Sequence, residues 1–246
     1  MDSFFNSNVA VQFLSIFVIG LLTRIVVYYG LTGLAYLFFW QSKNPTVQNM
    51  RLKTRFESQP KAEALWALPT LVIFSFSLAL IFQLKSFTKL YFSIYELGLG
   101  YFVAIPIFLV FLHDAYFYFT HRLMHWEKFY KKVHYLHHRF KAPTPFAALA
   151  FHPLEAVVDG FFAPVVILLL PLHPFHVFLL FALMLVNNVY IHLGYEFKSL
   201  KFQQSKLGRI FFSPELHLRH HEGLKGNFGL YFTFWDHFFG TLVKRN

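Results

Sequence analysis

Long apolar stretches constrain the fold of this sequence more than any other feature. They cover roughly residues 9–40, 66–84, 97–120 and 160–191. The second runs for 19 residues, from Trp66 to Leu84, without a charged side chain, which is long enough for a helix to cross the hydrocarbon core of a bilayer. Because the backbone of a lipid-embedded segment must satisfy its own hydrogen bonds, we expect membrane helices here.

The fourth stretch is predicted to form a hairpin. No Asp, Glu, Lys or Arg occurs between Gly160 and Tyr195, but a Pro-Leu-His-Pro run at 171–174 interrupts the stretch near its middle. Proline breaks the helical hydrogen-bond pattern, so we expect two arms that enter and leave by the same face. Each arm is short for a full crossing, which favours a tilted or re-entrant hairpin.

Composition agrees with an all-α integral-membrane helical bundle of about four to five membrane segments, the hairpin included. Hydrophobic residues make up 56% of the chain and charged residues only 14%, too few to cover a soluble protein of this size. The absence of cysteine excludes disulfides, thiolate zinc sites, cysteine-held iron–sulfur clusters and thiolate-ligated haem. We expect a single domain, 1–246, with N-terminal membrane helices over 1–90 and a catalytic core over 91–246.

The basic residues predict the orientation of the chain in the membrane. Five Lys or Arg lie in 41–65, six in 121–141 and eight in 198–246, whereas the loop after residue 84 holds Lys85 and Lys89. The richer segments should face the cytoplasm, and the last of them should form a helical cap on that face. The net charge of +10 therefore reflects membrane topology, and no nucleic-acid partner is expected.

Three histidine clusters carry the chemistry of the sequence. They are His121-x3-His125, His134-x2-His137-His138 and His217-x2-His220-His221. Given 14 His, the pattern His-x2-His-His should arise by chance on the order of 0.05 times, yet it occurs twice. Residues three or four apart share one helix face, so each cluster can direct two or three imidazoles to a common point. The predicted topology places all three clusters on the cytoplasmic side.

The inventory of candidate metal ligands is large. It comprises nine histidines, with Asn188 as a further candidate through a water: His121, His125, His134, His137, His138, His192, His217, His220 and His221. A tetrahedral zinc takes four ligands, so nine predict two metals of five or six coordination, or one metal with many supporting residues. Imidazole suits iron, zinc and copper alike, which leaves the ion open.

Five further residues are candidates for positions that support these ligands: Asp114, His152, Glu155, Glu196 and Asp236. A carboxylate that accepts the second ring proton of a ligand histidine fixes its tautomer and its orientation. His152 precedes Pro153 and is expected to support the site or the local structure rather than to bind metal.

These residues resemble the fatty acid hydroxylase and sterol desaturase superfamily of integral-membrane di-iron oxygenases. The likeness covers about residues 50–246 and includes all three histidine spacings. It extends to Phe151-His-Pro-Leu-Glu155, His192-Leu-Gly-Tyr-Glu196, Asn227-Phe-Gly229 and the tail from Trp235 to Thr241. The first ninety residues are similar, more diffusely, to the C-5 sterol desaturase branch. Asn188 stands where some members of the superfamily have a histidine.

The resemblance implies two iron ions, with zinc as an alternative in purified protein. It implies that the site uses dioxygen and two external electrons to hydroxylate or desaturate a C–H bond of a sterol or long-chain lipid. The sequence carries no haem domain, flavin motif or nicotinamide fingerprint, so the donor should be a separate protein, such as cytochrome b5 or a ferredoxin, with its reductase. The basic face suits an acidic carrier. The membrane would be the endoplasmic reticulum or a bacterial inner membrane.

Two other classes stay open. A zinc-dependent membrane hydrolase or amidase would attack a lipid carbonyl with a metal-bound water, but it would need fewer histidines. A metal transporter or sensor would place its ligands near the bilayer midplane, whereas the predicted ligands lie at the cytoplasmic ends of helices. The oxygenase interpretation accounts for all nine histidines.

Overall fold

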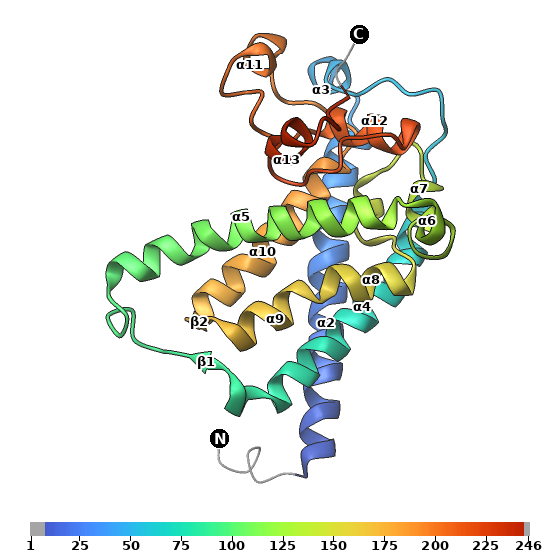
Figure 1. Ribbon diagram of the computed structural model, residues 1–246. Coiled ribbons are helices and arrows are strands. Elements are labelled where there is room, and N and C mark those ends of the chain that lie inside the picture. Colours follow the sequence, from blue (N-terminus) through green and yellow to red (C-terminus); the bar gives the residue numbers. More distant parts are fainter. Residues whose placement is uncertain (1–7, 244–246) are drawn as a thin grey trace.

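The computed structural model describes residues 8–243, and these form a helical bundle (Figure 1). The long helices are α2 (Val9–Ala35), extended by the π-helical turn η1 (Tyr36–Trp40), α4 (Pro60–Gln83), α5 (Leu99–Met124) and α10 (Pro174–Ile191). The shorter elements are α3 (Pro45–Asn49), η2 (Lys85–Phe87), β1 (Lys89–Leu90), α6 (Glu127–Val133), α7 (Tyr135–His138), η3 (Pro145–Leu149), α8 (Pro153–Gly160), α9 (Phe162–Leu169), β2 (Pro171–Leu172), α11 (Leu200–Gln204), α12 (Pro214–Gly223) and α13 (Phe234–Phe238).

Four helices are long and apolar enough to span a membrane, namely Val9–Trp40, α4, α5 and α10. The predicted all-α class and the predicted membrane segments are thereby confirmed, and the chain is a multi-pass membrane protein. The first arm of the predicted hairpin is shorter than a span, because α8 and α9 have eight residues each. The second arm, α10, is long and apolar enough to span the membrane.

Hydrogen bonds made by the Pro-Leu-His-Pro run stabilise the hairpin turn. Strand β2 pairs in parallel with β1, so the turn is tied to the segment that follows α4. The His173 side chain then accepts a hydrogen bond from the Phe175 amide and caps α10, whose first residue is Pro174. Proline suits this position because the first amides of a helix lack partners within it.

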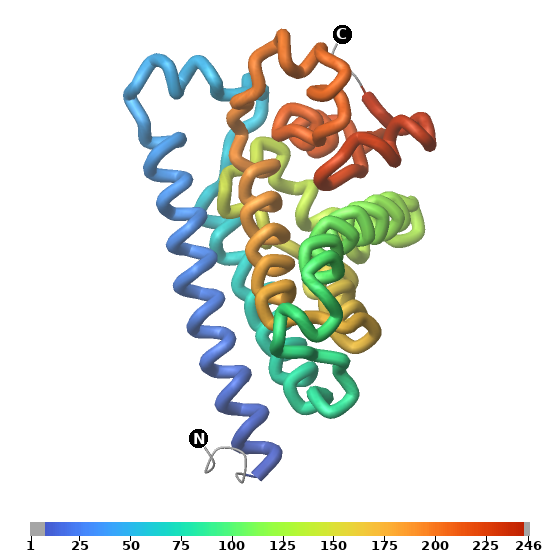
Figure 2. Tube along the Cα trace, turned by 90° about the vertical axis from the view of Figure 1, so that its left-hand side faces the viewer, coloured from blue at the N-terminus to red at the C-terminus, as the bar shows by residue number. Residues whose placement is uncertain are grey.

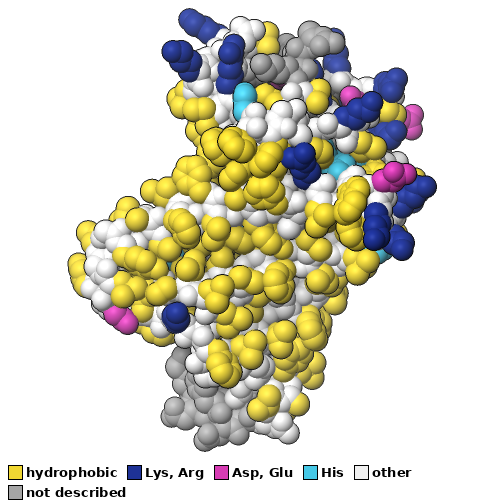
Figure 3. Space-filling view, viewed as in Figure 1, with side chains coloured by type: hydrophobic (Ala, Val, Ile, Leu, Met, Phe, Trp, Pro, Cys, Tyr) yellow, Lys and Arg dark blue, Asp and Glu magenta, His cyan; other side chains and the backbone are white. Residues whose placement is uncertain are grey.

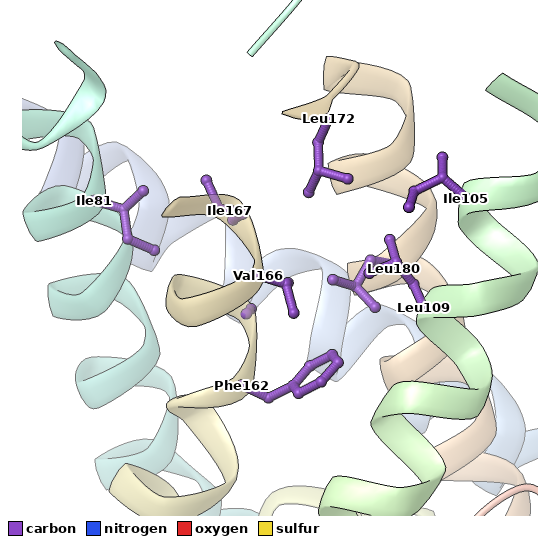
Figure 4. Close-up of a cluster of buried hydrophobic side chains, with 9 residues drawn as sticks. Ile81, Ile105, Leu109, Phe162, Val166, Ile167, Leu172 and Leu180 are labelled. Atoms are coloured by element: carbon purple, nitrogen blue, oxygen red, sulfur yellow. The ribbon is translucent and has the colours of Figure 1, made fainter. Parts of the chain in front are cut away.

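A cluster of buried aliphatic side chains joins four of the helices (Figure 4). Ile81 of α4, Leu109 of α5, Val166 of α9 and Leu180 of α10 point toward one another in it. These apolar contacts fix α5 and α10 against each other, so the C-terminal ends of both helices are carried to the same end of the bundle. Figure 2 shows the C-terminal part of the chain, α12 and α13 included, gathered at that end.

Hydrogen bonds attach this C-terminal cap to the bundle. The Asp114 carboxylate on α5 accepts from the Tyr231 amide at 2.8 Å and from the Phe232 amide at 3.2 Å. The Trp40 indole donates to the Leu193 carbonyl at 2.8 Å and links the end of η1 to the segment after α10. Asp114 therefore supports the cap by holding its backbone.

Leu172→Ala should destabilise the bundle, because Leu172 is 0% exposed within the aliphatic cluster and its loss leaves a cavity. Large-to-small changes of this kind cost roughly 2–5 kcal/mol. We expect the thermal midpoint in detergent, followed by size-exclusion chromatography, to fall on the order of 10 °C. The matched control is Leu169→Ala, whose side chain is 63% exposed. Equal midpoints for the two variants would contradict the packing described.

Candidate metal centre

Nine histidine side chains converge where α5, α7, α10 and α12 meet. They form two groups, and within each group the candidate ligand nitrogens all lie within 4.8 Å of one another. The five-histidine group contains His121, His125, His134, His138 and His220, and the four-histidine group contains His137, His192, His217 and His221. Eight of the nine are buried, and His125 is half-buried. The nine predicted histidine candidates are thus brought together without exception.

Each His-x2-His-His motif contributes to both groups. His134 and His138, four residues apart, belong to the five-histidine group, while His137 belongs to the other. In α12 the assignment is reversed: His217 and His221 join the four-histidine group, and His220 joins the five-histidine group. Adjacent residues point about 100° apart around a helix, so neighbouring histidines face different centres. The sequence predicted that the histidines of each motif share one metal site. The structure instead divides each His-x2-His-His motif between two sites.

The Nε2 atoms form an unbroken series of close contacts within each group. In the five-histidine group these atoms lie 3.0 Å apart in the pairs His121–His134, His134–His138, His138–His125 and His125–His220. In the four-histidine group the Nε2 separations are 3.2 Å for His137–His192, 2.9 Å for His192–His217 and 3.1 Å for His217–His221. All nine imidazoles therefore present the same nitrogen to the interior of their group.

Backbone carbonyls on the opposite side of several rings fix the tautomer. Nδ1 of His121 lies 3.0 Å from the Phe228 carbonyl, and Nδ1 of His220 lies 2.7 Å from the Gly226 carbonyl. Nδ1 of His192 lies 2.8 Å from the Asn188 carbonyl. A carbonyl only accepts, so each of these Nδ1 atoms must carry the proton, and Nε2 keeps its lone pair for the centre.

Glu155 contacts the outward nitrogen of His134. A carboxylate oxygen of Glu155 lies 2.8 Å from His134 Nδ1, and both side chains are almost fully buried. Burial raises the pKa of Glu155 well above its usual value, but cations held by the neighbouring histidines would lower it again and keep the carboxylate ionised. Glu155 is the one predicted supporting carboxylate that directly contacts a histidine of the two groups.

Asp236 acts one step further from the histidines, through the loop that carries the Phe228 and Gly226 carbonyls. Its carboxylate accepts from the Phe228 and Gly229 amides at 2.9 and 2.8 Å. Gly229 is required by close approach: a Cβ there would lie 2.5 Å from the Phe232 carbonyl oxygen and 3.0 Å from Asp236 Oδ2. The Asn-Phe-Gly run and Asp236 thus shape one loop that holds His121 and His220.

Burial keeps the imidazoles neutral. Desolvation lowers the pKa of His137, His138 and His217 well below the usual value, and the neighbouring imidazoles lower it further. Desolvation also lowers the pKa of His192 to about 4. Metal binding requires neutral imidazole, so this environment suits a metal site.

Three of the other candidates lie outside the two groups. The Asn188 amide donates to the Ala148 carbonyl at 2.5 Å, although the side chain also lines the space beside the histidines. His152 caps α8 by accepting from the Leu154 amide at 3.3 Å. Glu196 accepts from the Lys198 amide at 2.9 Å in the segment after α10.

An apolar cavity of about 360 Å³ opens beside the histidines. Its walls come from α2, α4, α5, α8, α9 and α10, and Arg24 is among its few charged residues. Phe117, Phe151, Asp159 and Asn188 line both this cavity and the small space around the histidines, so they lie between the two, and we call this position the throat. The sequence interpretation missed Asp159. Its signal was its position four residues after Glu155, on the same face of α8.

Comparison with known proteins assigns the family. The model of the family named fatty acid hydroxylase matches residues 106–241, which is more than half of the chain and includes all nine histidines. The chain belongs to the fatty acid hydroxylase family. It is therefore an oxidoreductase of the sterol desaturase and fatty acid hydroxylase type, as the resemblance of its motifs to that superfamily implies.

Its curated relatives act on sterols, according to their names. The chain is 28% identical to a Δ7-sterol 5(6)-desaturase of Aspergillus fumigatus, over 98% of the chain and 66% of that protein. It is 28% identical to lathosterol oxidase of Mus musculus, over 96% of the chain and 77% of that protein. It is 34% identical to methylsterol monooxygenase 1 of Rattus norvegicus, over 54% of the chain and 44% of that protein. No solved structure matches the chain.

Glu155→Gln should weaken metal binding, because it removes the negative charge that lies against His134. Changes to such supporting residues typically reduce metal affinity by roughly 10- to 100-fold. The affinity is measured by competition with a chelator of known strength. Glu196→Gln is the matched control, since Glu196 contacts the Lys198 amide rather than a histidine. An unchanged affinity in Glu155→Gln, or an equal loss in both variants, would contradict the role given to Glu155.

Proposed function

We propose that this protein is a membrane-bound di-iron oxygenase that hydroxylates or desaturates a C–H bond of a sterol. The observation that carries the proposal is the division of nine buried histidines into a group of five and a group of four beside an apolar cavity. Two bound irons would supply the activation of dioxygen with two electrons from an external donor. The residues of this chain would hold the irons, orient the ligand rings and exclude water from the site.

The nitrogen separations fit metals of high coordination number. At a metal–nitrogen distance of about 2.1 Å, neighbouring ligand nitrogens lie about 3.0 Å apart in an octahedron and about 3.4 Å apart in a tetrahedron. The observed Nε2 separations of 2.9 to 3.2 Å match the octahedral value. The five-histidine group would hold one metal and the four-histidine group the other, and the two metals together would supply the activation of dioxygen.

The chain contributes orientation, dryness and charge balance. The Phe228, Gly226 and Asn188 carbonyls and the Glu155 carboxylate hold the rings so that Nε2 faces the metals. The apolar walls of the cavity would exclude water that could quench an oxidising centre. Neutral histidines alone leave two metals strongly cationic, and Glu155 supplies a nearby negative charge. Of these effects, the exclusion of water is the one that favours oxidation of an apolar substrate over hydrolysis, because hydrolysis consumes water.

The cavity is the proposed substrate site. It lies among the membrane helices, so a lipid can reach it from the bilayer, and its throat ends at the histidines. The relatives named for sterols support a sterol as the lipid. We further propose that the histidine centre faces the cytoplasm. Figure 3 shows lysine and arginine side chains around the cap end of the molecule, as the distribution of charge in membrane proteins predicts for that side.

The same basic surface is the proposed docking site for an electron donor. Helix α6 carries Lys128, Lys131 and Lys132. His134 of the five-histidine group directly follows its last residue, so these lysines lie close to that group. An acidic carrier such as cytochrome b5 or a ferredoxin, reduced by its own reductase, complements this charge. The rate of electron transfer should therefore fall with rising salt.

The decisive test is metal content together with turnover. Protein purified gently from iron-replete cells should contain two irons per chain, coupled as a pair in Mössbauer spectra. With a reduced donor and dioxygen it should convert a Δ7-sterol into a desaturated or hydroxylated product detected by mass spectrometry. One zinc without iron, combined with hydrolysis of a lipid ester or amide, would instead establish the hydrolase alternative.

His220→Ala and His137→Ala remove one candidate ligand from each group. We expect each variant to insert into the membrane, to lose metal and to retain less than about 1% of the activity, because a lost ligand leaves its partners misplaced. Membrane insertion is checked by fractionation, and metal by elemental analysis. The control is His173→Asn at the hairpin turn, which keeps the capping function and should keep both metals. Full metal content in His220→Ala or His137→Ala would refute the ligand assignment.

A further inference from the structure

One carboxylate oxygen of Asp159, a half-buried residue of α8, has no hydrogen-bond partner among the residues that the structure describes. Its Oδ1 atom is buried and unpaired. Buried polar atoms are paired in the great majority of cases, and an unpaired carboxylate oxygen in an apolar wall is costly. Asp159 also lies outside both histidine groups, so metal binding does not account for it. A ligand group that donates a hydrogen bond in the cavity would give this oxygen the partner it lacks.

Asp159 lies between the proposed substrate cavity and the histidines. Together with Asn188 it belongs to the throat between the apolar cavity and the space around the histidines. The amide nitrogen of Asn188 is already engaged with the Ala148 carbonyl, which orients this side chain. The throat therefore offers oxygen acceptors within an otherwise apolar passage.

The surroundings of Asp159 select among possible ligand groups. Glu155 lies one helical turn earlier on the same face of α8, and it lines the space around the histidines together with Asp159. A ligand carboxylate or phosphate in the throat would be repelled by these acidic groups. A neutral hydroxyl can form a hydrogen bond with either protonation state of Asp159. The carboxylate accepts a hydrogen bond from the hydroxyl, and the protonated carboxyl donates one to the hydroxyl oxygen.

We infer that Asp159 binds the hydroxyl group of a 3-hydroxysterol and so selects which ring carbons lie nearest the metal centre. The inference rests on the proposed function, since it assumes that the cavity receives the substrate. A hydroxyl held in the throat places the ring that carries it next to the histidines. The rest of the sterol extends into the apolar cavity. Asp159 is thus a positioning residue rather than a metal ligand.

The test compares binding of a Δ7-3-hydroxysterol with that of its 3-deoxy analogue, using purified metal-loaded protein. The wild type should bind the hydroxylated sterol roughly 10- to 100-fold more tightly, since a site with a buried acceptor rejects a ligand that leaves it unpaired. In Asp159→Ala the two affinities should agree within about twofold. Asp159→Asn, which is isosteric and still accepts, should keep part of the preference.

Ser77→Ala is the matched control, because Ser77 lines the cavity but not the throat and should keep the full preference. Metal content and thermal midpoint confirm that each variant is folded. The inference is overturned if the wild type binds no 3-hydroxysterol, if it binds both sterols equally, or if Asp159→Ala keeps the preference. A preference without turnover would refute the proposed function alone, whereas turnover of both sterols with equal KM would refute the role of Asp159 alone.

Discussion

The burial of nine neutral imidazoles in one place is the constraint on which the rest of this structure depends. A buried imidazole is stabilised when a hydrogen-bond partner or a metal takes the place of the water that its nitrogens lose. Carbonyls of the Gly226–Phe228 loop, the Asn188 carbonyl and the Glu155 carboxylate serve the outward nitrogens of four rings. The inward nitrogens face one another at 2.9 to 3.2 Å, a spacing that two cations would stabilise.

The membrane helices serve this arrangement by bringing distant segments to one end of the bundle. The aliphatic cluster fixes α5 against α10, and these helices carry His121 and His192 at or near their C-terminal ends. Asp114 and Asp236 then hold the C-terminal segment by its backbone, so α12 can add its three histidines. The apolar cavity is a consequence of the same packing, because helices that meet at the cap leave space between α2, α4 and α10.

Much of the site could be predicted because its residues follow helical spacing. The separation of three and four residues in the two His-x2-His-His motifs indicates metal binding without any knowledge of the fold. The roles of the acidic residues could not be separated in the same way. Glu155, Asp236 and Glu196 are equally plausible from their positions in the chain, yet one contacts a histidine, one holds a loop and one accepts from Lys198. These differences depend on which backbone atoms come near each carboxylate.

The sequence by itself determined the membrane class, the positions of the spans and the nine candidate ligands, because these depend on local composition and on a fixed helical period. Only the tertiary structure decided that His137 and His138, adjacent in the chain, belong to different groups. It also decided that Asp159 borders the cavity, while His152 caps a helix. Helix geometry sets the angle between neighbouring side chains, but the packing of α7 against α10 and α12 determines what each side chain faces.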